Sequence, residues 1–154
     1  MPSLTRRHVL ACAALGALGG AGAYAAHWFN VTARNDGDGL LSPPQAHRAA
    51  EAGAILLVDI RRPDEWARTG VGEGAQPLDM RRPDFAQALV HLAGGETGAP
   101  IALICARGVR SRHLSAALTN AGFTNIIDIP EGMLGSGAGP GWMARGLPVI
   151  AWQG

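Results

Sequence analysis

The chain has 154 residues, enough for one globular domain, and 47% of them are hydrophobic, so a sizeable core can be buried. Its formal net charge of +1 argues against a nucleic-acid partner. All 13 basic residues are arginine, which excludes chemistry that depends on a lysine amine.

The first predicted element is an export signal over residues 1–25. Arg6 and Arg7 precede an uncharged, mildly apolar stretch that ends in small residues. The segment TRRHVL resembles a twin-arginine export signal, and the sequence Ala23-Tyr24-Ala25 suits cleavage after Ala25. We therefore expect a periplasmic protein. The alternative is an uncleaved N-terminal segment that anchors the chain to the cytoplasmic membrane.

Export with cleavage would also change the number of cysteines in the mature protein. Cleavage after Ala25 would remove Cys12 and leave Cys105 as the single thiol, in an oxidising compartment. Such a cysteine forms no disulfide within its own chain, which points to a reactive thiol or to an intermolecular bond.

After the signal we expect a linker over residues 26–40 and a folded domain over residues 41–154. The linker contains the turn-forming sequence NDGDG. The domain should open with a helix that Ser42 and Gln45 cap as an S-x-x-Q box and that ends at Gly53.

Three short apolar runs are typical of strands buried on both faces of a parallel sheet, at residues 54–60, 100–104 and 124–129. Helices are predicted between and after these runs, within residues 62–70, 82–95, 111–122 and 140–152. The residues expected on the buried faces of the two longer helices are Phe85, Ala88, Leu89 and Leu92, and then Leu114, Ala117, Leu118 and Ala121.

Strands that alternate with helices imply right-handed crossovers and an α/β fold of three layers, a mostly parallel sheet with helices on both faces. In such sheets ligands bind beyond the carboxyl ends of the strands. Cys105 comes at such an end, directly after the strand predicted over residues 100–104 and just before a helix.

The segment CARGVRS, which starts at Cys105, is rich in arginine and lies at a predicted helix start, as expected for a site that binds an anion. Amide N–H groups at the start of a helix are unpaired and favour an anion, and nearby positive charge favours the thiolate form of a cysteine. Arg107, Arg110 and Arg112 supply that charge, and Gly108 permits a tight turn. These features predict a reactive thiolate.

The same segment resembles the active-site loop of rhodanese-domain sulfurtransferases, C-x-x-G-x-R-[ST]. The segment LLVDIRRPDEWARTGVGEGA resembles a second motif of that family, and Asp59, Arg61 and Glu65 fall on its positions. The closing EGMLGSGAGPGWMARGLPV resembles a third. Together the resemblance covers residues of about 41 to 151.

Two departures from the family pattern stand out. The family's His-Ile pair is Val71-Gly72 here, which removes that histidine and is expected to loosen the local strand. Extra glycines lie between Gly132 and Trp142, where they shape the rim of the pocket or form a tolerated insertion.

The resemblance implies a rhodanese-like fold and an exported single-domain sulfurtransferase. Cys105 would take a sulfane sulfur from thiosulfate or a persulfide and pass it to a thiol, a protein or cyanide. The residues implied in the loop that holds the anion are Ala106, Arg107, Gly108, Val109 and Arg110. Arg107 would attract the donor at the mouth of the site, and Arg110 would turn inward and fix the loop.

Supporting roles fall to Asp59, Arg61, Glu65 and Ser111, the first three as an ion-pair network rather than as catalysts. Trp66 and Trp142 are expected to pack in the core or at the rim, and His113 to be solvated. No cofactor is expected. No metal ion is expected either, because the histidines are scattered and lack ligand spacing.

Two alternatives remain at this stage. One is a sulfur carrier or sensor that acts with a protein partner and has no turnover of its own. The other is a cysteine-dependent phosphatase or an arsenate reductase, whose loops place five residues between Cys and Arg, whereas four separate Cys105 from Arg110.

Overall fold

The computed structural model describes residues 39–154, so the predicted export signal and nearly all of the predicted linker lie outside the described residues. The elements in chain order are α2 (Pro43–Glu51), β1 (Leu56–Asp59), α3 (Pro63–Thr69), β2 (Val71–Gly72), β3 (Ala75–Pro77), α4 (Phe85–Leu92), β4 (Ile101–Ile104), α5 (Val109–Asn120), β5 (Ile126–Asp128), α6 (Gly141–Ala144) and β6 (Val149–Ile150).

The central sheet has four parallel strands in the order β3-β1-β4-β5. Val58 in β1 lies opposite Leu103 in β4, which in turn lies opposite Asp128 in β5. Leu40 adds a parallel bridge to Asp128 at the edge of the sheet. The predicted parallel sheet is confirmed, and β3 is a strand that the apolar pattern did not indicate.

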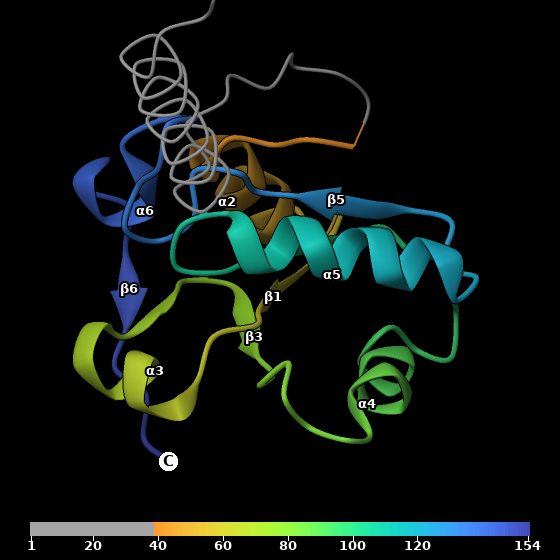
Figure 1. Ribbon diagram of the computed structural model, residues 1–154. Coiled ribbons are helices and arrows are strands. Elements are labelled where there is room, and N and C mark those ends of the chain that lie inside the picture. Colours follow the sequence, from red (N-terminus) through yellow and green to blue (C-terminus); the bar gives the residue numbers. More distant parts are fainter. Residues whose placement is uncertain (1–38) are drawn as a thin grey trace, which may run out of the picture.

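Alternate residues of the strands point to opposite faces and build two separate cores. Val58, Ile101 and Leu103 pack with α4 and α5, whereas Leu57, Ala102 and Ile104 pack with α2 and α6 (Figure 1). The sheet is therefore covered on both sides, as predicted, because β4 is apolar at every position and β1 at every position before Asp59.

The predicted cap of α2 is confirmed. The backbone N–H of Ser42 donates to Oε1 of Gln45 at 2.8 Å, and the helix ends at Glu51, just before Gly53. Pro43 occupies the first turn, where its missing N–H costs no hydrogen bond.

The predicted buried faces of the longer helices are correct only in part. In α4, Phe85 and Leu89 are buried but Leu92 is 38% exposed. In α5, Leu118 is buried and Leu114 is half-buried against the core, whereas Ala117 and Ala121, which directly follows the helix, are exposed. Ser111 extends this buried face into the first turn of α5, where its hydroxyl contacts Cys105.

The expected loosening at Val71-Gly72 is wrong. Both residues are buried, and β2 pairs antiparallel with β6 near the C-terminus. A Cβ atom on Gly72 would lie 2.9 Å from the ring of Trp142, which is fully buried. Glycine stands here because the indole occupies the space that a side chain would need.

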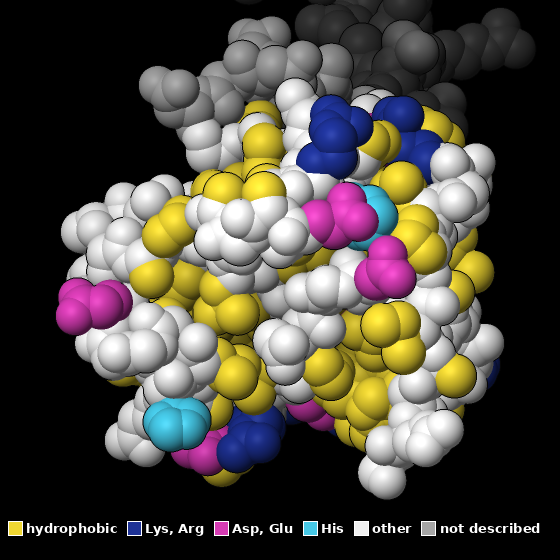
Figure 2. All heavy atoms as spheres, turned by 180° about the vertical axis from the view of Figure 1, so that it is seen from behind, with side chains coloured by type: hydrophobic (Ala, Val, Ile, Leu, Met, Phe, Trp, Pro, Cys, Tyr) yellow, Lys and Arg dark blue, Asp and Glu magenta, His cyan; other side chains and the backbone are white. Residues whose placement is uncertain are grey.

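Charged groups of both signs are interspersed on the face turned away in Figure 1, and hydrophobic atoms reach the surface between them (Figure 2). Among residues 39–154, the large hydrophobic side chains that are exposed are Leu92, Leu134, Met143, Val149 and Ile150. No helix in this part of the chain combines the length and the apolar character that a bilayer-spanning helix needs.

Candidate functional site

The site lies at the carboxyl edge of the central sheet. The chain leaves β1 toward β3 on one side and later returns to β4 on the other, so the carboxyl ends of β1 and β4 flank a topological switch point. Asp59 ends β1 and Cys105 directly follows β4. The parallel register therefore brings two of the predicted site residues to the same edge.

The loop from Cys105 to Arg110 forms a cradle of backbone amides. Gly108 adopts a left-handed conformation, with φ of 74°, and α5 begins at Val109. Within residues 39–154, no hydrogen bond engages the backbone N–H groups from Ala106 to Arg110. This set of free donors at a helix start favours a bound anion.

The segment after β5 holds the other side of the cradle. The backbone N–H groups of Met133 and Leu134 donate to the carbonyls of Cys105 and Ala106, each at 2.8 Å. A Cβ atom on Gly132, whose φ is 68°, would lie 2.6 Å from the carbonyl oxygen of Ala106. The loop carbonyls are thus tied down on one side, and the amides stay available to a ligand.

The thiol of Cys105 is nearly inaccessible, since the residue is 1% exposed. Its Sγ lies 3.6 Å from Oγ of Ser111, which is fully buried and also donates to the carbonyl of Gly108 at 3.3 Å. A hydroxyl can accept from a thiol and donate to a thiolate. Ser111 can therefore serve both protonation states of the sulfur.

Arg110 fixes this loop through Glu65. Its Nη1 and Nη2 donate to the two carboxylate oxygens of Glu65, each at 2.7 Å. Burial alone would raise the pKa of Glu65, but hydrogen bonds from Arg110 and Arg62 and the nearby positive charge lower it to about 2. The pair with Glu65 raises the pKa of Arg110, and negative charge on Cys105 raises it further.

Asp59 and Arg61 form a separate ion pair in the interior. Nη2 of Arg61 lies 2.7 Å from Oδ2 of Asp59, and both side chains are at most 1% exposed. Arg61 also donates to Oγ1 of Thr69 and to the carbonyl of Gly70. The pair therefore ties the end of α3 to β1, which is a structural role.

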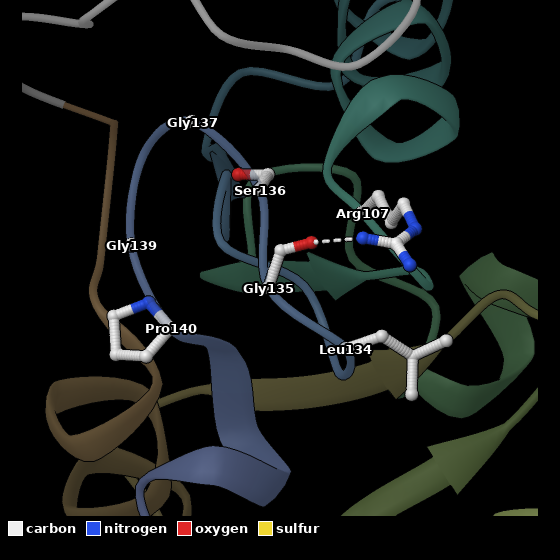
Figure 3. Close-up of a pocket in the computed structure, with 7 residues that line it drawn as sticks. All are labelled: Arg107, Leu134, Gly135, Ser136, Gly137, Gly139 and Pro140. Carbon is white, nitrogen blue, oxygen red and sulfur yellow. Dashed lines mark hydrogen bonds between the residues drawn. The ribbon is translucent and has the colours of Figure 1, made fainter.

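Arg107 lies on the other side of the loop, beside the glycine-rich segment (Figure 3). Its side chain reaches the carbonyl of Gly135 through Nη1, at 3.2 Å. The residues that line this pocket of about 450 Å³ are Arg107, Leu134, Gly135, Ser136, Gly137, Gly139 and Pro140.

The extra glycines are held in place by one carboxylate. Glu131 is 4% exposed and accepts hydrogen bonds from the backbone N–H of Gly141 and from Nε and Nη2 of Arg145. The glycine-rich segment is therefore fastened at both ends and forms a wall of the pocket beside Arg107.

A second pocket, of about 320 Å³, lies on the opposite side of the loop. Its lining residues are Arg62, Glu65, Met80, Arg81 and Arg110. Met80 and Arg81 were not predicted as site residues. They follow β3, and this strand of three residues is too short to give an apolar run that would have placed them at this edge.

Three side chains that could together bind a metal ion, His47, Glu51 and Glu73, were not predicted from the sequence. Nε2 of His47 lies 3.1 Å from Glu73, and its Nδ1 lies 3.6 Å from Glu51. The ligand atoms of this group all lie within 4.8 Å of one another and could hold a metal ion. His47 and Glu51 are one helical turn apart, but Glu73 joins them only through the tertiary structure.

The chain is similar to known proteins in both sequence and structure. Residues 42–135 match the family model described as the rhodanese-like domain. Over 93 residues the chain is 32% identical to the thiosulfate sulfurtransferase GlpE of Stutzerimonas stutzeri (strain A1501), covering 60% of this chain and 78% of the relative.

Two further proteins are similar. The chain is 29% identical over 105 residues to a tRNA uridine(34) hydroxylase of Chlamydia abortus, covering 66% of this chain but only 32% of that relative. The chain thus spans about a third of that hydroxylase. The solution structure of a homodimeric polysulfide-sulfur transferase from Wolinella succinogenes aligns with a TM-score of 0.57 and 25% identity, over 73% of this chain and 78% of that one.

Proposed function

The chain belongs to the family of rhodanese-like domains, and we propose that it is a sulfurtransferase that carries a sulfane sulfur as a persulfide on Cys105. The observation that supports this most directly is the cradle itself. Cys105 directly follows a buried strand at the switch point of the sheet, and five backbone N–H groups around it have no partner within residues 39–154.

In the first step the thiolate of Cys105 attacks the outer sulfur of thiosulfate. A new S–S bond forms to Cys105, the S–S bond of thiosulfate breaks, and its electron pair leaves with sulfite. A persulfide donor reacts in the same way and releases a thiolate. The terminal sulfur of the Cys105 persulfide then carries the negative charge, which the amides from Ala106 to Arg110 and the hydroxyl of Ser111 stabilise.

In the second step a thiol or cyanide attacks that terminal sulfur. The bond to Cys105 breaks and its electron pair returns to the cysteine as a thiolate, while the acceptor leaves as a persulfide or as thiocyanate. Two displacements through one covalent intermediate predict ping-pong kinetics. No step needs a cofactor.

The arginines near the site have different roles in this proposal. Arg110 is held by both oxygens of Glu65, so it positions the loop and offsets its negative charge. Arg107 is exposed and recruits anions toward the mouth of the site. Asp59 and Arg61 support β1 and α3 from the interior.

The test is sulfur transfer by the full chain with Cys105→Ser as the control. We expect thiocyanate from thiosulfate and cyanide, and a mass gain of one sulfur on the wild type alone. A mass gain without thiocyanate would favour the carrier that depends on a partner. If the wild type gains no sulfur, the proposed chemistry is wrong.

We also propose that the protein works in the periplasm. This rests on Arg6 and Arg7 and on the small residues around Ala25, which suit export and cleavage. Retention of the segment as an anchor in the cytoplasmic membrane is the competing possibility, and the two differ in the size of the protein found in the cell.

A further inference from the structure

We propose that His47, Glu51 and Glu73 form a binding site for one divalent transition-metal ion of the zinc class. The first two residues lie on α2 and the third lies in the turn between β2 and β3. None of the three lines either pocket beside the Cys105 loop. Metal binding here would therefore not depend on the proposed sulfur transfer.

The three side chains already lie at distances close to those of a metal site. Nε2 of His47 is 3.1 Å from Oε2 of Glu73, and the ligand atoms of all three residues lie within 4.8 Å of one another. Around a tetrahedral zinc ion with bonds of about 2.0–2.2 Å, neighbouring ligand atoms are about 3.3–3.6 Å apart. Small rotations of the two glutamates would thus give a site with three protein ligands and an open position for water.

The cluster carries negative charge that no arginine offsets. Within residues 39–154, Glu51 and Glu73 each pair with His47 and with no arginine. A neutral imidazole has one N–H, so it can donate to only one of the two carboxylates that face its nitrogens. The other carboxylate then faces a lone pair, an arrangement that a bound cation would relieve.

The ring of His47 is held in position by its surroundings. It is 9% exposed and packs edge-on against the indole of Trp142, with ring centroids 5.4 Å apart. The carbonyl of Pro148 accepts from Nε1 of Trp142 and from the backbone N–H of Glu73. The histidine and the backbone of Glu73 are thus tied to the same point, which lowers the entropy cost of bringing the ligands together.

The two glutamates can reach the ion without a change in the core. His47 and Glu51 are four residues apart in α2, so their side chains share one face of the helix. The turn that bears Glu73 lies against the same helix, since a Cβ atom on Gly74 would be 3.3 Å from Cβ of Ala50. The side chains of Glu51 and Glu73 are 55% and 45% exposed, which leaves them free to rotate.

The donor atoms select the class of ion. An imidazole nitrogen together with carboxylate oxygens suits zinc and its first-row neighbours, whereas Mg²⁺ and Ca²⁺ prefer sites made of oxygen alone. Zinc is therefore the probe, and magnesium is the control ion that tests for a general attraction of cations to the two carboxylates.

The first test is calorimetric titration of zinc into the full chain with Cys12→Ser and Cys105→Ser, so that no thiol competes for the metal. We expect one site, which Glu51→Gln or Glu73→Gln weakens by at least about tenfold, because loss of a ligand costs no less than loss of a residue that orients one. These half-exposed positions carry the test, since the buried His47 also packs against Trp142.

Matched controls come from the same residue types elsewhere. His91 and Glu96 are exposed and do not belong to the cluster. His91→Gln and Glu96→Gln should therefore change the zinc affinity by less than about twofold. Magnesium at the same concentration should not displace the zinc.

A second measurement places the ion. Zinc should shift the NMR signals of the His47 ring and leave those of His91 unchanged. At about a hundredfold excess over the dissociation constant it should raise the melting temperature by about 5–10 °C, because the site exists only in the folded chain. Glu73→Gln should remove most of that rise.

Equal zinc affinity in the cluster variants and the control variants would overturn the site. So would zinc that leaves the His47 ring unperturbed, which would mean that a proton rather than a metal ion sits between the carboxylates. Displacement by magnesium would reduce the cluster to a general attraction for cations and would also contradict the proposal. Because the thiols are absent, each result is independent of sulfur transfer by Cys105.

Discussion

Glu65 shows how one residue joins α3 to the loop that bears the thiol. Both of its oxygens accept from Arg110, and one also accepts from the backbone N–H of Arg62. The residues predicted as one ion-pair network divide in the structure: Asp59 pairs with Arg61, whereas Glu65 pairs with Arg110 and Arg62. Sequence spacing cannot reveal this division, because Arg110 is 45 residues away from Glu65.

The low pKa of Glu65 makes the stability depend on pH. Its pKa is about 2 in the folded chain against 4.5 ordinarily, so the ionised form favours folding. That contribution, about 2 kcal/mol once solvent screening is allowed for, is complete above pH of about 4.5 and is lost as the pH falls toward 2. Urea unfolding at several pH values measures it.

Glu65→Gln should lower the free energy of unfolding at pH 7 and flatten the loss between pH 4.5 and 2 relative to the wild type. Asp84→Asn is the control, because Asp84 pairs with Arg82 at the surface. An acid limb that stays as steep in Glu65→Gln as in the wild type would show that other carboxylates cause it.

Among the elements, β2 and its partner β6 show the effect of one missing side chain. Gly72 leaves room for the ring of Trp142 in α6, whose Nε1 donates to the carbonyl of Pro148 at 2.9 Å. The helix α6, the strand β6 and the edge at β2 are therefore packed as one unit. A pattern based on strand propensity sees only a glycine and predicts a weak strand.

Gly72→Ala should destabilise the fold by about 1–3 kcal/mol, because the added Cβ would overlap an indole that has no room to move. Gly98→Ala is the control, since a Cβ atom there would meet Thr124 at an ordinary 3.5 Å. Thermal unfolding followed by circular dichroism compares the two. Equal melting temperatures would contradict the packing argument.

At the scale of the whole molecule, the sheet order decides which loops meet. The loops after β3, β1, β4 and β5 follow one another along a single edge, and two pockets with different linings lie on either side of the Cys105 loop. The pocket of glycine backbone and one arginine is on the β5 side, and the pocket of three arginines is on the β3 side.

The proposed export also concerns the whole chain. Cell fractionation should find the protein in the periplasm, shortened near Ala25, and replacement of Arg6 and Arg7 by lysine should retain the full-length precursor in the cytoplasm. A full-length protein in the membrane fraction would instead support the anchor. Correct export of the lysine variant would contradict the twin-arginine route.

Local patterns were enough to identify much of this protein. The apolar runs, the cap at Ser42 and the segment from Cys105 to Ser111 predict a parallel α/β sheet with a thiol at its edge, because each depends on residues close together in the chain. Spacing also places Arg110 at the end of the loop.

Only the tertiary structure decided which groups far apart in the sequence become neighbours. It brings Arg81 beside Arg110, Glu73 beside His47 and Gly72 under Trp142. These neighbours are set by strand order and side-chain packing, to which residues far apart in the sequence contribute. The position of the thiol is thus a local property of the chain, whereas the surroundings of the thiol are a property of the fold.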